Sequence, residues 1–138
     1  MEENCIFCKI ARGEIPSATV YEDETFRGIL DVNPMTKGHA LLVPKAHYAD
    51  LCALDHGIAA KALPVAARIG GAMKDALGCD GFNILQNNGA AAEQSVFHFH
   101  LHIIPRYAGD GKRFSGGQQG ADAQELQDTA AKIRSAVG

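Results

Sequence analysis

The strongest constraint on this chain is the segment Val96 to Arg106, in which apolar residues alternate with histidines. Its three successive even positions are His98, His100 and His102, and the odd positions from 97 to 103 are all apolar. Because neighbouring side chains of a β-strand point to opposite faces, the pattern predicts a strand with three imidazoles on one face. Imidazole binds zinc, attacks phosphorus and titrates near neutral pH, so the pattern predicts a chemical site.

Length and charge limit the possible classes of protein. The chain has 138 residues, which fits one domain. It carries 13 basic and 16 acidic residues, a net charge of −3, so no surface for a nucleic acid polymer is predicted, whereas small anions remain possible ligands. The sequence shows neither an export signal nor an apolar run long enough for a membrane span, and we expect a soluble, cytoplasmic protein.

The other elements predict an α+β domain. Short links between successive β-like segments favour antiparallel pairing. Apolar residues three or four apart over residues 55–77 predict an amphipathic helix that ends at Gly78 and is kinked or short of one hydrogen bond at Pro64. A short helix is predicted over residues 5–12. The predicted strands cover residues 19–22, 26–31, 39–44, 81–86 and 96–106.

The last thirty residues differ from the rest. Residues 109–120 are rich in glycine, which predicts a flexible connection. Residues 122–137 predict a helix with Asp122 as its N-cap and Leu126, Ala130 and Ile133 on one face. We expect this helix to dock on the domain or on a partner.

Cys5 and Cys8 form a C-x-x-C pair, which by itself indicates half of a zinc site or a redox pair. No thioredoxin-like βαβ pattern surrounds it. Cys52 and Cys79 lie in or beside helical sequence and are expected to be buried thiols.

The segment Gln94 to Ile104 resembles the signature of the histidine triad (HIT) family. Further segments resemble its bacterial, Hint-like branch with an N-terminal C-x-x-C, and they occur in the same order, so that the likeness spans residues 5–106. These segments are Cys5 to Ile10, Glu14 to Pro16, Asp31 to Pro34, Gly38-His39 and Pro44 to His47.

The resemblance implies a HIT fold: a five-stranded antiparallel sheet with one main helix, a short N-terminal helix and a C-terminal helical tail. The catalytic domain would cover residues 1–108, with residues 109–138 as glycine-rich linker and C-terminal helix. The family fold is paired into a homodimer that binds a purine nucleotide beside the triad.

The resemblance also assigns catalytic roles. His100 would attack the α-phosphorus through Nε2, with its Nδ1 proton held by the carbonyl of His98. His102 and Ser95 would donate hydrogen bonds to phosphate oxygens. His39 would complete the network, or else have a structural role at a strand end.

Substrate contacts follow from the same resemblance. Asp31 would accept from the ribose hydroxyls, although it could equally cap the turn before Asn33-Pro34. Residues that would contact the phosphate are Asn87, Ser95 and Gln94, and those that would wall the base are Phe7, Ile10 and Val32, together with Ile29 and Leu30. Many relatives have glycine where this chain has Glu93, whose carboxylate could repel an anion if it pointed inward.

In relatives with this C-x-x-C pair, a structural zinc is held by two cysteines and two histidines. Here the ligands would be Cys5, Cys8, His47 and His98. The alternative is a pair of reduced thiols with no metal. No organic cofactor is expected.

The predicted function is therefore hydrolysis or transfer at the α-phosphate of purine nucleoside phosphoramidates or related AMP conjugates, through a nucleotidyl-histidine. Dinucleoside polyphosphates are alternative substrates. Two other classes stay open: a metallohydrolase in which His98, His100 and His102 all bind a catalytic ion, and a nucleotide-binding regulatory module with incidental turnover.

Overall fold

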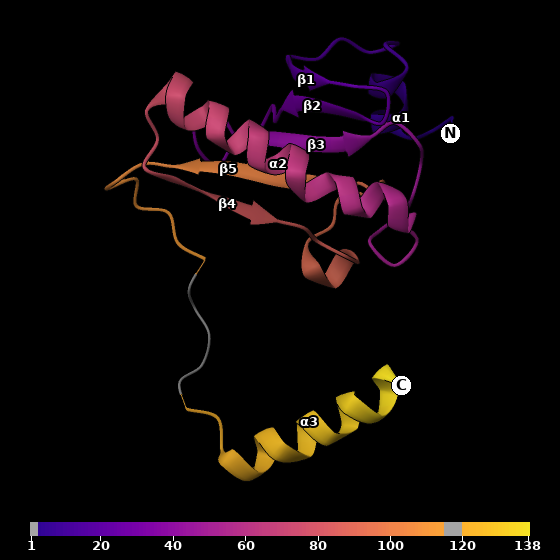
Figure 1. Cartoon of the computed structure of the whole chain (residues 1–138), viewed down its shortest axis with the longest axis vertical. Coiled ribbons are helices and arrows are strands. Elements are labelled where there is room, and N and C mark those ends of the chain that lie inside the picture. Colours follow the sequence, from indigo (N-terminus) through magenta and orange to yellow (C-terminus); the bar gives the residue numbers. More distant parts are fainter. Residues whose placement is uncertain (1–2, 115–119) are drawn as a thin grey trace.

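The computed structural model describes residues 3–114 and 120–138, and it contains one antiparallel sheet and three α-helices within those ranges (Figure 1). In chain order the elements are α1 (Ile6–Ala11), β1 (Thr19–Glu22), β2 (Phe26–Leu30), β3 (Ala40–Pro44), α2 (His56–Leu77), β4 (Gly81–Leu85), a 3₁₀ turn (Ala90–Ala92), β5 (Leu101–Arg106) and α3 (Ala123–Val137). The predicted α+β class with five antiparallel strands is confirmed.

The spatial order of the strands is β1-β2-β3-β5-β4. The first three strands form the predicted meander, whereas β5 enters between β3 and β4, so that β4 becomes an edge. The helix α2 connects β3 to β4 and runs across the sheet, so the two strands need not be neighbours and β5 can pair between them (Figure 1). Consequently β5, which carries His102, lies in the interior of the sheet.

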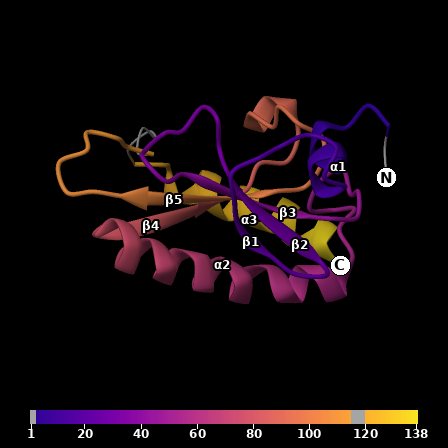
Figure 2. The ribbon, with the colours of Figure 1, turned by 90° about the horizontal axis from the view of Figure 1, so that it is seen from above.

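Alternation along β2 shows how the two faces of the sheet differ. Phe26 and Leu30 pack with α2 in the larger apolar cluster. Ile29 points to the other face, where it packs with Phe7 and Ile10 of α1. Figure 2 shows α2 and α1 on opposite sides of the sheet. The candidate site therefore lies on the α1 face, opposite the main core.

Both ends of α2 follow from local chemistry. The Asp55 carboxylate accepts a hydrogen bond from the Ile58 N–H at 3.0 Å and caps the first turn. Gly78 ends the helix at φ 66°, a left-handed conformation that favours glycine, as predicted. Pro64 lies inside the helix, which runs unbroken from His56 to Leu77, so the predicted disturbance does not divide it.

Two adjacent glycines of α2 supply a matched test of the packing. A Cβ built on Gly70 would lie 2.3 Å from the ring of Phe82, whereas one on Gly71 would meet nothing within 4 Å. We expect Gly70→Ala to lower the free energy of unfolding by about 1–3 kcal/mol through overpacking. Gly71→Ala should raise it by roughly 0.5–1 kcal/mol because alanine favours a helix. Urea unfolding of both variants measures the difference, and equal shifts would refute the close contact.

The C-terminal helix α3 forms as predicted, with the Asp122 carboxylate accepting from the Glu125 N–H at 3.0 Å. Every residue of α3 is exposed, so it does not dock on its own domain. The prediction of a flexible connection falls partly on residues 115–119, which lie outside the described residues. Within the described ranges, no helix has the length and apolar character needed to cross a membrane.

Candidate active site

The three histidines do not all lie in a regular strand, which corrects the predicted boundary of residues 96–106. β5 begins at Leu101, so that only His102 belongs to it. The reason lies in the partner strand, since the ladder between β3 and β5 extends no further than Leu42↔Leu101. Before that point the Phe99 N–H donates to the Tyr48 carbonyl at 2.6 Å, outside the sheet. The extended backbone nevertheless keeps the imidazoles of His100 and His102 neighbours, with ring centroids 5.0 Å apart.

His100 is buried and its tautomer is fixed. Its Nδ1 lies 2.8 Å from the His98 carbonyl, which can only accept, so Nδ1 carries the proton. The neutral ring then has its lone pair on Nε2. Burial lowers the pKa of His100, although the backbone hydrogen bond and Asp31 oppose that shift. The rings of Phe7 and His100 pack nearly perpendicular to each other, with centroids 4.9 Å apart. The site therefore holds a neutral imidazole with one free lone pair.

A second chain of hydrogen bonds fixes His102. The Met35 N–H donates to His39 Nδ1 at 3.0 Å, so the proton of neutral His39 is on Nε2. His39 Nε2 donates in turn to His102 Nδ1 at 2.9 Å. The remaining proton of His102 is thereby placed on Nε2, where it can be donated to a ligand. Adjacent to the His100 lone pair, the site thus presents a hydrogen-bond donor.

Burial lowers the pKa of His102 to about 4, with the neighbouring His100 and His39 adding to the effect. In the unfolded chain a histidine titrates near 6.5. Between about pH 6.5 and 4 the unfolded state therefore binds a proton on His102 that the folded state does not. The contribution of neutral His102 to the free energy of unfolding is complete above that window and is lost as pH falls through it. We expect the free energy of unfolding of His102→Gln to vary less steeply with pH there, by up to about 1.4 kcal/mol per pH unit. Urea unfolding from pH 7.5 to 4.5 measures both slopes, and parallel curves would contradict the assignment.

Asp31 serves the turn and also lies near the histidines. Its Oδ1 accepts from the Asn33 N–H at 2.9 Å, so the turn-capping alternative is present in the structure. Its Oδ2 lies 3.7 Å from His39 Nε2. Asp31, His39 and His102 are close enough together to be considered as ion ligands. The Met35 N–H, however, occupies the single lone pair of neutral His39, so this trio is better described as a hydrogen-bonded network.

A separate group of four side chains could hold a metal ion. The ligand atoms of Cys5, Cys8, His47 and His98 all lie within 4.8 Å of one another. Cys8 Sγ is 3.3 Å from His47 Nδ1 and 3.5 Å from His98 Nδ1. Tetrahedral zinc with ordinary bond lengths would separate S and N ligands by roughly 3.5 Å. The donor set therefore fits zinc, with Cys5 and Cys8 brought together because Cys5 caps α1 and Cys8 lies in its first turn.

His98 is oriented for that group. Its Nε2 donates to the Pro44 carbonyl at 2.8 Å, which leaves the lone pair on Nδ1, the atom that faces both cysteine sulfurs. His98 is fully buried, and burial lowers its pKa to about 4. Its side chain therefore faces a different centre from His100. This division argues against one ion bound by His98, His100 and His102.

The predicted substrate contacts are placed unevenly. Phe7, Ile10 and Ile29 form a buried apolar cluster on the α1 face. Val32 is 91% exposed, so it lines no closed pocket. Leu30 points to the α2 face, which corrects its predicted place beside the base.

The candidate phosphate residues occupy the loop after β4. Ser95 is exposed and lines an open pocket of about 550 Å³ with Asn4, Ile6 and Phe97. Asn87 is half-buried. Gln94 is buried, and its amide donates to the Ala49 and Val96 carbonyls at 2.7 and 3.1 Å while accepting from the Gly89 N–H. Its side chain therefore shapes the loop, and its backbone N–H donates to the Gly89 carbonyl at 3.1 Å.

Comparison with known proteins adds independent information. The HIT domain family model matches residues 12–109. The chain belongs to the HIT family. Protein hit of Bacillus subtilis is 43% identical over 136 residues, which are 94% of each chain. An adenosine 5'-monophosphoramidase of Saccharomyces cerevisiae is 42% identical over 77% of this chain and 65% of its own. An adenylylsulfatase of Arabidopsis thaliana is 46% identical over 77% of this chain and 54% of its own.

Solved structures match the whole fold. A Streptococcus mutans protein superposes with a TM-score of 0.94 at 37% identity, over 100% of this chain and 88% of its own. That coverage includes α3. A zinc-bound histidine triad protein of Mycobacterium smegmatis superposes with a TM-score of 0.77 at 41% identity, over 96% of this chain and 97% of its own.

Glu93 adopts a left-handed backbone conformation, the kind that favours the glycine expected at this position from the family resemblance. Its φ is 69°, and it is the one non-glycine residue with positive φ in the part of the chain described. Such a conformation costs a residue with a Cβ about 1–2 kcal/mol. Glu93 is exposed, so the structure offers no sign of a carboxylate buried in this HIT site.

Sequence reasoning missed the backbone groups that orient the histidines. The Met35 N–H and the Pro44 and Tyr48 carbonyls carry no side-chain signature. A general rule could have signalled them, because buried polar side chains nearly always have at least one hydrogen-bond partner. Cys52 is exposed, contrary to expectation, whereas Cys79 is buried as predicted.

Proposed function

We propose that this HIT protein is a nucleotide hydrolase or nucleotidyl transferase that acts on the α-phosphate of purine nucleoside phosphoramidates or related AMP conjugates. The observation that carries the proposal is the tautomer of His100. The His100 Nδ1–H donates to the His98 carbonyl at 2.8 Å, which leaves the lone pair on His100 Nε2. That lone pair can act as a nucleophile at neutral pH. The lowered pKa of His100 keeps the ring neutral there.

In the first step, His100 Nε2 attacks the α-phosphorus. A bond forms from nitrogen to phosphorus as the bond to the leaving amine breaks, and the amine takes up a proton from solvent. His102 Nε2–H and the Ser95 hydroxyl donate to the phosphoryl oxygens, where charge accumulates. In the second step, water attacks the same phosphorus and loses a proton to solvent as the bond from phosphorus to His100 Nε2 breaks, so that AMP is released and His100 recovers its lone pair. Another acceptor in place of water would make the reaction a transfer.

Relatives support the substrate class. The yeast relative is named an adenosine 5'-monophosphoramidase and the Arabidopsis relative an adenylylsulfatase. Both names describe a bond to the phosphorus of AMP. Asp31 would accept from the ribose hydroxyls through Oδ2, since Oδ1 is used in the turn. Phe7 and Ile10 would wall the base, the Asn87 side chain would contact the phosphate, and Gln94 would shape the loop beside it. The adenylyl mixed anhydride is a second substrate candidate.

The four-residue group is proposed as a structural zinc site. Bound zinc would supply a cross-link between α1, the chain after β3 and the segment before β5, with all four ligands from the protein. Among the supporting observations are the fitting distances, the buried Cys8 and His98, and a zinc-bound HIT neighbour. By fixing His98, the site would also hold the carbonyl that orients His100.

A homodimer is proposed from the free edge of the sheet. β4 pairs with β5 on one side only, and Ile84 on it is 39% exposed. An unpaired edge with an apolar side chain is a template for pairing with a second copy. A cytoplasmic location stays a prediction from the sequence.

The decisive experiment is intact-mass analysis after the protein is mixed with an adenosine phosphoramidate. We expect an adduct of one adenylyl group on the wild type and none on His100→Ala. The same reaction with a chelator removes the metallohydrolase alternative if the folded, metal-free protein still forms the adduct. Full turnover by His100→Ala would contradict the proposal. A parallel assay with an adenylyl mixed anhydride and with a dinucleoside polyphosphate ranks the substrates.

A further inference from the structure

The C-terminal helix α3 has an apolar face with nothing packed on it. Leu126, Ile133 and Val137 recur on one side and are 55%, 59% and 81% exposed. An isolated helix of this length is marginal in water, because most helical stability in proteins comes from packing an apolar face. A surface that receives α3 is therefore needed.

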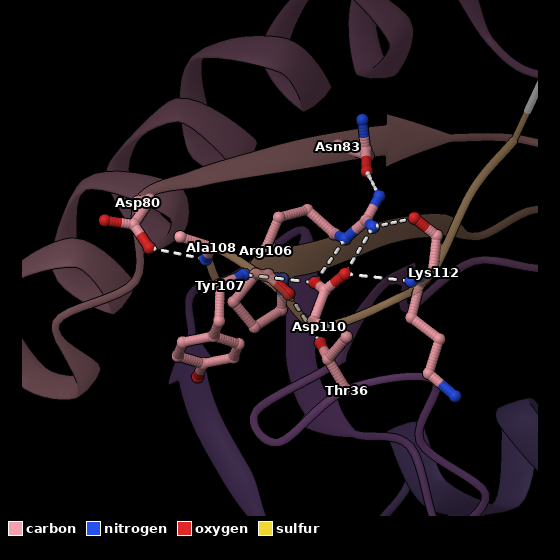
Figure 3. A network of polar contacts seen from close by, with 9 residues as sticks. Thr36, Asp80, Asn83, Arg106, Tyr107, Ala108, Asp110 and Lys112 are labelled. Atoms are coloured by element: carbon pink, nitrogen blue, oxygen red, sulfur yellow. Dashed lines mark hydrogen bonds and ion pairs between the residues drawn. The ribbon is translucent and has the colours of Figure 1, made fainter.

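The chain leaves β5 in a fixed direction. Arg106, at the end of β5, donates to the Asp110 carboxylate through Nε and Nη2 at 2.8 Å each, and to Asn83 of β4 at 2.9 Å (Figure 3). It also binds the Lys112 carbonyl, and its guanidinium lies 5.7 Å from the ring centroid of Phe114. These contacts hold residues 110–114 beside the β4 edge. The departure of the tail on this side is thus built into the domain.

The helix that follows lies beyond β4, away from the domain (Figure 1). Seen from above, it covers neither the α1 side nor the α2 side of the sheet (Figure 2). The Streptococcus mutans structure superposes over 100% of this chain with a TM-score of 0.94, so its match to this chain includes α3. The side on which α3 lies is also the side of the free strand edge, where a second copy would pair.

The domain carries an apolar groove that could receive such a helix. The groove has a volume of about 410 Å³ and lies between α2 and the β1–β2 hairpin. Its apolar lining includes Val20, Leu30, Ile69, Ala76 and Leu77.

The groove and α3 are complementary in charge. Lys37 and Arg68 also line the groove. The first half of α3 and its cap carry Asp122, Glu125 and Asp128. In the order of strands, β1 is the edge opposite to β4, so the groove of the same chain lies on the far side of the sheet from α3.

We propose that α3 is a clasp between subunits, whose apolar face packs into the α2/β1–β2 groove of a second copy of this chain. The inference rests on the homodimer proposed above. The Arg106 contacts hold the start of each tail, residues 110–114, beside β4, and the exchange of two helices buries both apolar grooves. The occupant of the groove is thus a segment of the partner, and no small molecule is required there.

Cross-linking of the full-length chain tests the arrangement. Leu126→Cys in a tagged chain and Ala76→Cys in an untagged chain, both with Cys52→Ser, are mixed and oxidised. We expect a disulfide between the tagged and untagged chains. Asp75→Cys in place of Ala76→Cys is the control, since residue 75 neighbours the groove without lining it, and we expect at least about tenfold less product. A third chain carries both Leu126→Cys and Ala76→Cys. A disulfide formed within that single chain, or a disulfide between two chains that both carry Leu126→Cys, would overturn the proposal.

Sedimentation of the dimer gives a second readout. Leu126→Asp with Ile133→Asp should raise the dissociation constant about tenfold or more. Ala131→Asp with Ser135→Asp, on the opposite face of α3, should leave it unchanged. A wild-type chain that stays monomeric would refute the homodimer itself. A wild-type dimer that both pairs of substitutions leave intact would refute the clasp alone.

Discussion

Replacement of His100 by alanine is expected to lower the rate of the chemical step with an adenosine phosphoramidate by a factor on the order of 10⁴ to 10⁶. The change removes the one imidazole whose lone pair is free and whose tautomer is fixed by a buried carbonyl. His102 cannot take over, because its Nδ1 accepts from His39 and its Nε2 carries the proton. Single-turnover kinetics with enzyme in excess measure the step directly.

His56→Ala is the matched control for that variant. His56 is exposed at the first turn of α2, remote in the fold from the α1 face, and its loss should leave the rate unchanged. Nucleotide affinity should also survive in His100→Ala, since His102 and the loop after β4 remain. If the variant retained the wild-type rate and bound the nucleotide normally, His100 would not be the nucleophile.

Replacement of Cys8 by serine is expected to abolish stoichiometric zinc binding and to lower the melting temperature by more than about 10 °C. Cys8 Sγ is fully buried and lies within 3.5 Å of both candidate histidine ligands. The free energy of binding to a structural zinc site contributes directly to folding, and the loss of even about 3 kcal/mol gives a shift of this size for a domain of this length. Metal analysis and calorimetry on protein purified under reducing conditions measure both effects.

Cys52→Ser is the control for the cysteine chemistry. Cys52 is exposed and lies outside the four-residue group, so its replacement should change neither metal content nor melting temperature. A chelator should reproduce the destabilisation of Cys8→Ser in the wild type and have no further effect on the variant. Wild-type protein that holds no zinc and melts at the same temperature as Cys8→Ser would contradict the structural role.

Much of the fold could be predicted because the decisive signals are local. Gly78 ends α2 in a left-handed conformation and Asp122 caps α3, and each requires information from only a few neighbouring residues. Strand ends are a different matter. The start of β5 at Leu101 depends on where β3 stops pairing, which the residues of β5 do not specify.

The sequence by itself determined that the three histidines would sit together, since alternation with apolar residues expresses the geometry of an extended chain. It also indicated the metal group through the spacing of Cys5 and Cys8, although the two histidine ligands came from family resemblance. Only the tertiary structure decided what each imidazole can do. The tautomers of His98, His100 and His102 depend on the Pro44 and His98 carbonyls and on His39.

The physical reason is that the tautomer of a neutral imidazole is set by the hydrogen-bond partners at its two nitrogens. Those partners are backbone groups or residues distant in sequence. His39 and His102 are 63 positions apart, and His98 and Pro44 are 54 apart. The position of residues 110–112 after β5 was likewise decided by the contacts of Arg106 with Asn83 and Asp110. Residue types and their spacing therefore specify the histidine cluster, whereas long-range hydrogen bonds specify the role of each ring within it.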